Sequence, residues 1–409
     1  VLSQLTDTTW RAEKQHEEPA RSVGKTRRDS LHPLPYLTDY DPGHSVTRFL
    51  AKIDTLKQPI SHRPLIRIAF FGDSFVEGDM MIGDLRERLQ ERFGGNGVGW
   101  IDAGNELSSY RLSFKASAKG LTEHMAMKQE TYHPSHAGIA MRYYTIDAGK
   151  ASFSGCGVKE YPHAMHWQRA TLYLKTKETV HISSRSGNHI IQREVRASDH
   201  LQAVPLPVTA PVDGVQRDSL QPMALSFQLQ GNGDIYGVAM ESESGLVIDN
   251  LCMRGQSGAG LGRLPENILC EFQQLRPYDM IILQYGTNVI KDGTTVDDLN
   301  WYRKAMNRTI EHMKKCFPDV PIIIMSAADR GTRKQDDIVT MESVSLLLGI
   351  QEELAAHHHV AFYNLFEAMG GRNSMARLYH DHMCAKDLLH LTPSGGKYLA
   401  DRLYNIMCR

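Results

Sequence analysis

Two stretches in which a strand pattern precedes a helix pattern lie far apart in the sequence, and this separation constrains the fold most strongly. Residues 64–71 (PLIRIAFF) form a nearly continuous apolar run, which is typical of a parallel strand buried on both faces. After a short break, residues 83–93 place Leu85, Leu89 and Phe93 on one face of a helix. One strand and one helix cannot build a core alone, so this unit needs a sheet from elsewhere in the chain.

The C-terminal part of the chain supplies that sheet. Strand patterns alternate there with helix patterns, which indicates a parallel sheet covered by helices on both faces, a three-layer α/β/α fold. Thr392 is expected to cap the last helix, ahead of Pro393 in its first turn. The strands are predicted at 280–284, 320–326 and 360–364, and the helices at 296–316, 342–357 and 393–407.

Residues 111–249 have a different pattern. Short alternating stretches are separated by polar and glycine-rich turns with no strong helix pattern, which favours an antiparallel β-sandwich. The alternating stretches are 138–144, 170–174, 180–183, 224–229 and 235–240. We therefore predict an N-terminal arm at 1–60, an α/β domain at 61–110 and 250–409, and an inserted β-sandwich at 111–249.

Charge and composition exclude several classes of protein. Lys and Arg number 46 and Asp and Glu 47, a formal charge of −1, which gives no general basis for binding nucleic acid or an anionic membrane. Lys25, Arg27 and Arg28 are too few to form a binding surface, so a solvated arm is expected. No apolar run approaches the roughly 20 residues of a membrane helix. The start at Val1 leaves open a removed leader or a cloning boundary.

Residues with the chemistry of a serine nucleophile and its base stand at both ends of the α/β pattern. Ser74 follows the first strand in a sharp turn, at the carboxyl edge of the sheet where open α/β sheets bind ligands. Asp387 and His390 are three residues apart, so the carboxylate can hold one imidazole nitrogen while the other accepts the serine proton. Taken alone, His390 would be interpreted as an ordinary surface histidine. Its assignment as a catalytic base depends on its occurrence together with Ser74 and Asp387.

Two further loops at the same edge offer donors for an oxyanion. Asn288 ends the segment Gly286–Asn288, which comes just after the strand predicted at 280–284, and it can present its side-chain amide. Gly258, within Gly255–Ala259, can present a main-chain N–H because glycine allows close approach. Each could equally be a plain turn residue. Asp73 and Arg330 are candidates for binding substrate, although a surface ion pair explains Arg330 as well.

Histidine clusters suggest metal ligands but are better explained otherwise. The run 357–359 lies at a helix end, where histidine interacts favourably with the helix dipole. His380, His382 and Cys384 lie next to the Asp387 loop, and a zinc site there is the less favoured interpretation. We predict no metal and no cofactor.

Four short blocks resemble those of the SGNH (GDSL-like) hydrolase family. They are Phe71–Phe75 (FGDSF), the GQSGA stretch with Gly258, Gly286–Asn288 (GTN) and Asp387–His390 (DLLH), in the family's order. The resemblance implies a flavodoxin-like three-layer fold, Ser74, Asp387 and His390 as catalytic residues, and Gly258 and Asn288 in the oxyanion hole. Phe75 departs from the polar or smaller residue of many relatives.

The sequence is also similar to a branch that includes bacterial peptidoglycan O-acetylesterases with a carbohydrate-binding-module-like insertion. The segments that carry this are FFGDSFVEGDM at 70–80 and FGGNGVGW at 93–100. The resemblance implies removal of O-acetyl groups from peptidoglycan or another polysaccharide in the periplasm or cell envelope. Two alternatives stay open: a glycan O-acetyltransferase on the same fold, and a glycan-binding protein in which esterase activity is secondary.

Overall fold

A computed structural model describes residues 34–58, 64–104, 110–209 and 221–408, and all structural statements below refer to these residues. The basic run Lys25, Arg27 and Arg28 lies outside them, as does the first half of the predicted N-terminal arm. The described part of the arm contains strand β1 (Leu37–Asp39) and helix α1 (Ser45–Asp54), which pack on the sheet and helices that follow.

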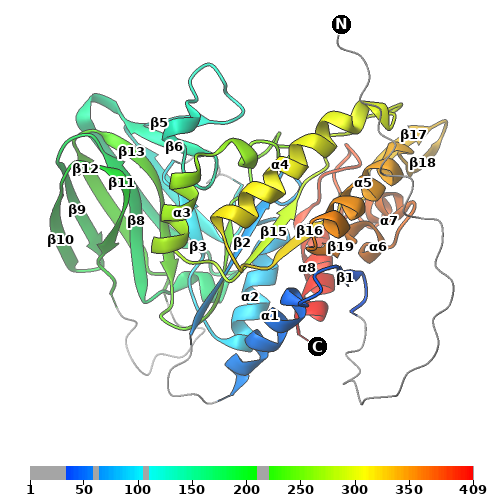
Figure 1. The fold of residues 1–409 in the computed structure, drawn as a ribbon. Coiled ribbons are helices and arrows are strands. Elements are labelled where there is room, and N and C mark those ends of the chain that lie inside the picture. The colour runs from blue at the N-terminus through cyan, green and yellow to red at the C-terminus, as the bar shows by residue number, and fades with distance from the viewer. Residues whose placement is uncertain (1–33, 59–63, 105–109, 210–220, 409) are drawn as a thin grey trace, which may run out of the picture. The chain divides into compact units, whose positions relative to one another are not determined.

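A six-stranded sheet forms the centre of the α/β part (Figure 1). Its order is β1-β19-β16-β15-β2-β14, and every neighbouring pair is parallel except β1 with β19. Strand β2 lies between β15 and β14, so the strand order reverses there, and such reversals place a crevice at the carboxyl ends of the strands. The bounds are β2 Leu65–Gly72, β14 Gly245–Asn250, β15 Met280–Gln284, β16 Ile322–Met325 and β19 Ala361–Tyr363.

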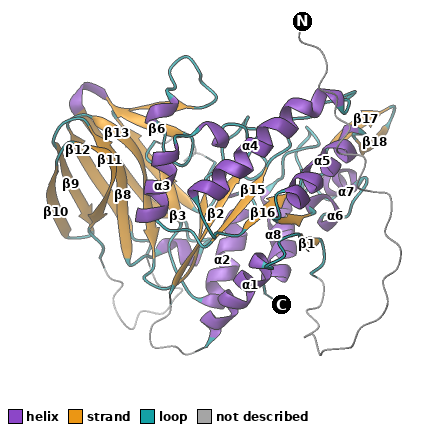
Figure 2. Cartoon of the chain, viewed as in Figure 1, coloured by secondary structure: helices purple, strands orange, loops and turns teal. Residues whose placement is uncertain are grey.

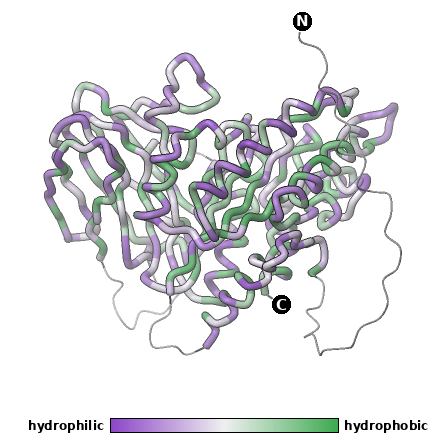
Figure 3. Tube along the Cα trace, in the orientation of Figure 1, coloured by the Kyte–Doolittle hydropathy of each residue, from purple (hydrophilic) through white to green (hydrophobic). Residues whose placement is uncertain are grey.

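Helices cover both faces of this sheet. Successive side chains of each strand point to opposite faces, so the apolar strands present apolar side chains on both faces, and the helices bury them. Along β2, Ile68 and Phe70 pack with α1, α2 and α8, whereas Ala69 and Phe71 pack with α3, α4 and α5. Figure 3 shows the hydrophobic residues concentrated along these central strands. The predicted three-layer α/β fold is thus confirmed. The helices are α2 Ile82–Phe93, α3 Glu266–Leu275, α4 Asn300–Cys316, α5 Ser343–His357, α6 Leu365–Ala368, α7 Ser374–His380 and α8 Pro393–Met407.

Two antiparallel sheets enclose a separate core beside the α/β part (Figure 2). Their orders are β10-β9-β12-β7-β4 and β11-β8-β13-β6-β5, and β3 also pairs with β13. We call strands β3–β13 the β unit. Their bounds are β3 Gly99–Asp102, β4 Phe114–Lys119, β5 Leu121–Met125, β6 Arg142–Ile146, β7 Lys150–Gly157, β8 Arg169–Thr176, β9 Val180–Ser186, β10 His189–Val195, β11 Ser198–Leu206, β12 Ala224–Gln230 and β13 Gly233–Glu241. A small hairpin, β17 (Gly331–Lys334) and β18 (Asp337–Thr340), completes the strands.

Some local predictions differ from the structure. The strand expected from Gly138 begins only at Arg142, because a turn closed by the Met141 N–H on the Gly138 carbonyl precedes it. The helix expected from Val296 begins at Asn300, after a single 3₁₀ turn at Asp297–Leu299. The last helix follows the prediction, with the Thr392 side chain accepting the Gly395 N–H.

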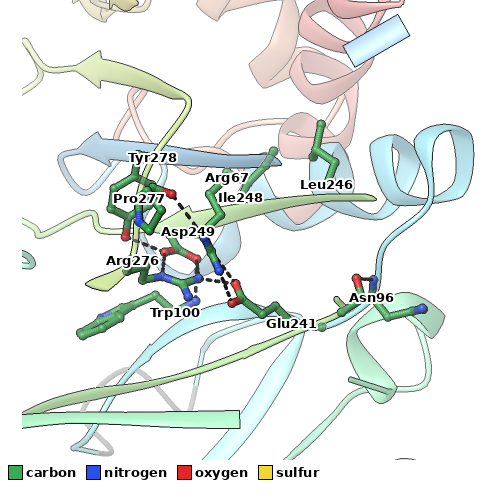
Figure 4. A network of polar contacts seen from close by, with 12 residues as sticks. Arg67, Asn96, Trp100, Glu241, Leu246, Ile248, Asp249, Arg276, Pro277 and Tyr278 are labelled. Atoms are coloured by element: carbon green, nitrogen blue, oxygen red, sulfur yellow. Dashed lines mark hydrogen bonds and ion pairs between the residues drawn. The ribbon is translucent and has the colours of Figure 1, made fainter. Parts of the chain in front are cut away.

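A buried network of charges joins the β unit to the parallel sheet (Figure 4). Arg276, which follows α3, donates from Nε to Asp249 Oδ2 at 2.6 Å and pairs with Glu241 Oε2 of β13 at 2.9 Å. Arg67 of β2 also pairs with Glu241, at 2.7 Å. The Trp100 N–H of β3 donates to Asp249 Oδ1 at 2.9 Å. Because the partners come from both sheets, the network fixes how β3 and β13 meet β2 and β14.

Candidate active site

Ser74 lies in a tight turn at the carboxyl end of β2. Gly72 ends the strand where a Cβ atom would stand 2.7 Å from Val76 Cγ2 and 3.0 Å from the Gln284 carbonyl oxygen, so a larger residue would push the turn away from β15. The Val76 N–H closes the turn on the Asp73 carbonyl oxygen. The Ser74 side chain therefore stands at the edge where the strand order reverses.

Three side chains form a continuous hydrogen-bonded chain. Ser74 Oγ lies 2.7 Å from His390 Nε2, and His390 Nδ1 lies 2.7 Å from Asp387 Oδ2. This geometry lets Asp387 fix the orientation of the imidazole and lets Nε2 accept the serine proton. Partial burial would raise the pKa of Asp387, but hydrogen bonds from the side chain and main chain of His390 outweigh it and hold that pKa below its ordinary value. Asp387 is therefore ionised at neutral pH.

The loop that carries Asp387 and His390 is fixed by its own main chain. Asp387 Oδ1 accepts the N–H groups of Leu389 and His390, at 3.1 and 3.0 Å. The Ala385 N–H donates to the His390 carbonyl oxygen at 2.7 Å, and the Gly331 N–H of β17 donates to Leu388 at 2.9 Å. These contacts hold the imidazole in place before any substrate arrives.

Gly258 and Asn288 lie in the loops that follow β14 and β15, on either side of the strand that leads to Ser74. Gly258 has φ +94°, and a Cβ atom there would stand 2.6 Å from Met306 Sδ, so glycine is required. Within the described residues, neither the Ser74 nor the Gly258 N–H donates a hydrogen bond. Asn288 Nδ2 donates to the Gln256 carbonyl oxygen at 3.0 Å, which ties the two loops together. The two free N–H groups are suitable donors for an oxyanion.

Asp73, a candidate for substrate binding, is fully enclosed. Its carboxylate accepts the Phe75 N–H at 2.9 Å, and the N–H and hydroxyl of Thr287 at 3.1 and 3.0 Å. Burial raises the pKa of Asp73 to about 6. The carboxylate thus links the loop of Ser74 to the loop of Asn288, and this position gives no support to a contact with substrate.

Arg330, the second such candidate, is bound to the same loop. Its Nη1 donates to the carbonyl oxygens of Thr287 and Ile290, at 3.1 and 2.6 Å. The guanidinium therefore holds the segment around Asn288. Among the described residues it forms no ion pair, so the surface ion pair considered from the sequence is not found.

Acidic residues just after the nucleophile turn were not singled out from the sequence. Asp79 is buried and pairs with Arg86 and Arg111 at 3.1 and 3.2 Å. Although burial favours its neutral form, the two guanidinium groups hold the pKa of Asp79 well below its ordinary range. Glu77 accepts hydrogen bonds from Arg254. The only sequence signal was the acidic spacing in FVEGD. Arg86 is seven residues from Asp79, but Arg111 and Arg254 lie 32 and 177 residues from their partners.

The histidine clusters considered as metal ligands from the sequence make other contacts in the structure. His358 Nε2 contacts Asn307 Oδ1 at 2.7 Å, and burial is the main cause that lowers the pKa of His358 to about 4. Among the residues that the structure describes, no group of three or more His, Cys, Asp or Glu side chains is arranged to hold a metal ion. In the same residues, no helix is long and apolar enough to cross a membrane.

Comparison with known proteins bears on the family and on the fold. Residues 228–398 match the family model described as the GDSL-like lipase/acylhydrolase family. A search of curated proteins finds no match. A solved peptidoglycan O-acetylesterase aligns over 90% of this chain and 97% of its own, with a TM-score of 0.70 and 17% identity.

Other solved structures align over a smaller part of the chain. An α/β hydrolase from the metagenome of Lake Arreo, Spain, covers 40% of this chain and 72% of its own, with TM-score 0.30 and 14% identity. An acetyl xylan esterase covers 39% and 80%, with TM-score 0.29 and 16% identity.

The fold and the family match define the class of protein. The chain is a carboxylic ester hydrolase, with the SGNH esterase fold and additional antiparallel sheets. Its residues 228–398, which contain three of the four sequence blocks, match the model of the GDSL-like lipase/acylhydrolase family.

Proposed function

We propose that this esterase removes O-acetyl groups from a glycan through an acetyl-Ser74 intermediate. The observation that carries the proposal is the chain from Ser74 Oγ through His390 to Asp387, with both distances at 2.7 Å. Such a chain makes a serine hydroxyl a nucleophile for acyl carbonyl carbons.

In the first half of the reaction, Ser74 Oγ bonds the acetyl carbonyl carbon while His390 Nε2 takes the hydroxyl proton. The negative charge on the carbonyl oxygen is held by the N–H groups of Ser74 and Gly258 and the side-chain amide of Asn288. The bond to the sugar oxygen then breaks, and His390 returns the proton to that oxygen. In the second half, water attacks the acetyl-enzyme as His390 removes its proton, and acetate and the Ser74 hydroxyl are released.

A groove on the outer face of the β unit supports a glycan as the substrate. It has a volume of about 680 Å³ and runs across the five-stranded sheet. Strand register aligns five hydrogen-bonding side chains in one row across it, which suits sugar hydroxyl groups. The row is Lys119, Ser152, Gln228, Ser183 and Gln192. We propose that the β unit, whose strands β4–β13 fall within the insertion predicted at 111–249, is a carbohydrate-binding module that holds the polymer.

The aligned peptidoglycan O-acetylesterase suggests which glycan to test first. On that basis we propose O-acetylated peptidoglycan, or a related bacterial or dietary polysaccharide, and a periplasmic, cell-envelope or secreted location.

The test is acetate release from 4-nitrophenyl acetate and from O-acetylated peptidoglycan, with wild type and Ser74→Ala side by side. We expect the wild type to release acetate from both substrates and Ser74→Ala to release it from neither. Ser74→Ala enzyme that keeps wild-type release would refute the acetyl-Ser74 intermediate. Ser74-dependent cleavage of the small ester alone would remove the glycan from the proposal. Addition of an acceptor sugar distinguishes the transferase alternative, because acetate would then give way to acetylated acceptor.

A further inference from the structure

Arg254 is an exposed cation beside the loops that carry Ser74 and Gly258. It lies in the loop that follows β14, four residues before Gly258. Its side chain is 53% exposed, whereas the side chain of its partner Glu77 is 5% exposed. Glu77 itself lies three residues after Ser74. The ion pair therefore joins the nucleophile loop to the Gly258 loop, and it presents the cation to solvent.

The way in which Glu77 holds Arg254 leaves the outer end of the guanidinium free. Glu77 Oε1 accepts the main-chain N–H of Arg254 at 3.1 Å, and Oε2 accepts Nε at 2.8 Å. Both carboxylate oxygens are thus used by the main chain and by Nε. Within the described residues, neither terminal nitrogen of the guanidinium has a hydrogen-bond partner.

The Tyr110 ring contacts the guanidinium. The Arg254 guanidinium carbon lies 4.9 Å from the centre of the Tyr110 ring, within the range of a cation–π interaction. Tyr110 is in turn held against Gly78, where a Cβ atom would come within 3.0 Å of the ring. The Met127 side chain packs against Gly255, the residue after Arg254. Tyr110 and Met127 are 39% and 46% exposed, so both side chains are accessible to a ligand.

A planar guanidinium that is held at Nε and in contact with an aromatic ring is ordered in advance, so little conformational entropy is lost when its two terminal nitrogens bind a ligand. Two parallel N–H donors match the geometry of a carboxylate. The exposed Tyr110 and Met127 add apolar surface of the kind on which a sugar ring can rest.

We propose that Arg254 binds a carboxylate on the glycan, so that the enzyme selects acidic O-acetylated glycans over neutral ones. Arg254 is then a specificity residue, and Tyr110 positions it. This inference rests on the proposed function, since it assumes that a glycan occupies the site of Ser74.

The experiment compares glycans before and after their carboxylates are neutralised. O-acetylated peptidoglycan and O-acetylated polygalacturonate are each prepared in native form and with carboxyl groups amidated by carbodiimide and glycinamide. Acetate release gives kcat and KM for wild type, Arg254→Met, Arg254→Lys and Arg169→Met. Arg169 is the matched control, because it is 50% exposed and pairs with Glu243 on the β unit away from these loops. Each variant is normalised to its own rate on 4-nitrophenyl acetate, which carries no carboxylate.

We expect wild type to prefer the native form of at least one glycan by roughly 10- to 100-fold, mainly through a lower KM. Arg254→Met should lose this preference, Arg254→Lys should keep part of it because the charge remains, and Arg169→Met should retain it. Equal rates of wild type on native and amidated glycans would overturn the proposal for Arg254 while leaving the esterase intact. A preference that persists in Arg254→Met would overturn it too. Ser74-dependent cleavage of the small ester without release from any glycan would instead refute the proposed glycan substrate, and this inference with it.

Discussion

Asp73 accepts hydrogen bonds from both the main-chain N–H and the hydroxyl of Thr287, so the residue before the nucleophile holds the loop that carries Asn288. Two neighbouring strands, β2 and β15, end at this contact. The relative position of Ser74 and Asn288 therefore depends on a carboxylate that is enclosed in the protein.

Thr287→Val removes one of these two hydrogen bonds with little change in shape. We expect kcat on 4-nitrophenyl acetate to fall about 10-fold, because small displacements of a catalytic group are costly, while KM changes little. Thr295→Val is a close control, since Thr295 also donates its N–H and hydroxyl to one aspartate, Asp298, but at an exposed loop. Equal effects of the two substitutions on kcat would show that the Asp73 contact has no special role.

Asn288→Ala tests the oxyanion assignment directly. Loss of one oxyanion donor is expected to lower kcat on the order of 10²–10³-fold. Part of any effect could come from the bond that Asn288 makes to the Gln256 carbonyl oxygen, so the unfolding midpoint in urea is measured alongside. Unchanged kcat in a folded Asn288→Ala enzyme would remove Asn288 from the mechanism.

Asp387→Asn addresses the role of the carboxylate that orients His390. Removing the corresponding charge in other serine enzymes costs about 10⁴ in kcat. Here the side chain of Asp387 is 49% exposed, so water can partly replace it, and we expect a smaller loss of roughly 10²–10³-fold. Asp381→Asn, six residues earlier at the end of α7, serves as the control. If both variants lost activity equally, a general effect of charge near the loop would explain the result.

The sequence predicted the catalytic loops better than the contacts that hold them. The apolar runs and their turns place Ser74, Gly258, Asn288 and His390 at one sheet edge, because this follows from local periodicity and chain direction. The structure brings Ser74, His390 and Asp387 together, while their catalytic roles stay predictions.

The partners of buried charges could not be read from the sequence. Glu77 and Arg254 are 177 residues apart, and Arg67 and Glu241 are 174 apart. Such pairs depend on how separate elements pack, and local patterns carry no information about that. Asp73 illustrates the same limit: its position beside Ser74 suggested contact with substrate, but the turn directs its carboxylate inward to Thr287.

The raised pKa of Asp73 predicts a specific dependence of stability on pH. Burial raises this pKa from 3.8 to about 6, so the folded protein binds the proton more tightly than the unfolded chain. The contribution of Asp73 to stability is therefore fully present below about pH 4 and is lost as the pH rises through about 6. A rise of this size corresponds to roughly 3 kcal/mol.

Urea unfolding of wild type and Asp73→Asn at pH 4 and pH 7 measures this effect. The stability advantage of wild type over the variant should shrink by up to about 3 kcal/mol between the two pH values. Asp298→Asn is the control, because hydrogen bonds from Thr295 lower the pKa of Asp298 and its contribution cannot decrease in this way. A constant difference between wild type and Asp73→Asn would mean that Asp73 titrates normally.

Arg276 should be the most sensitive residue at the junction of the β unit and the parallel sheet. It is fully buried between Asp249 and Glu241, so Arg276→Met leaves two carboxylates without their shared cation. Removing one partner from a buried charge network costs about 3–5 kcal/mol, whereas an exposed pair contributes about 0–1 kcal/mol. Arg303→Met, which breaks the exposed pair with Glu353, is the control.

A second substitution separates uncompensated charge from lost packing. If the unpaired carboxylate causes the loss, adding Asp249→Asn to Arg276→Met should restore part of the unfolding free energy, since the buried negative charge is removed. If lost packing causes it, the double variant will be less stable than Arg276→Met alone. A loss in Arg276→Met no larger than that in Arg303→Met would mean that the network does not hold the β unit to the sheet.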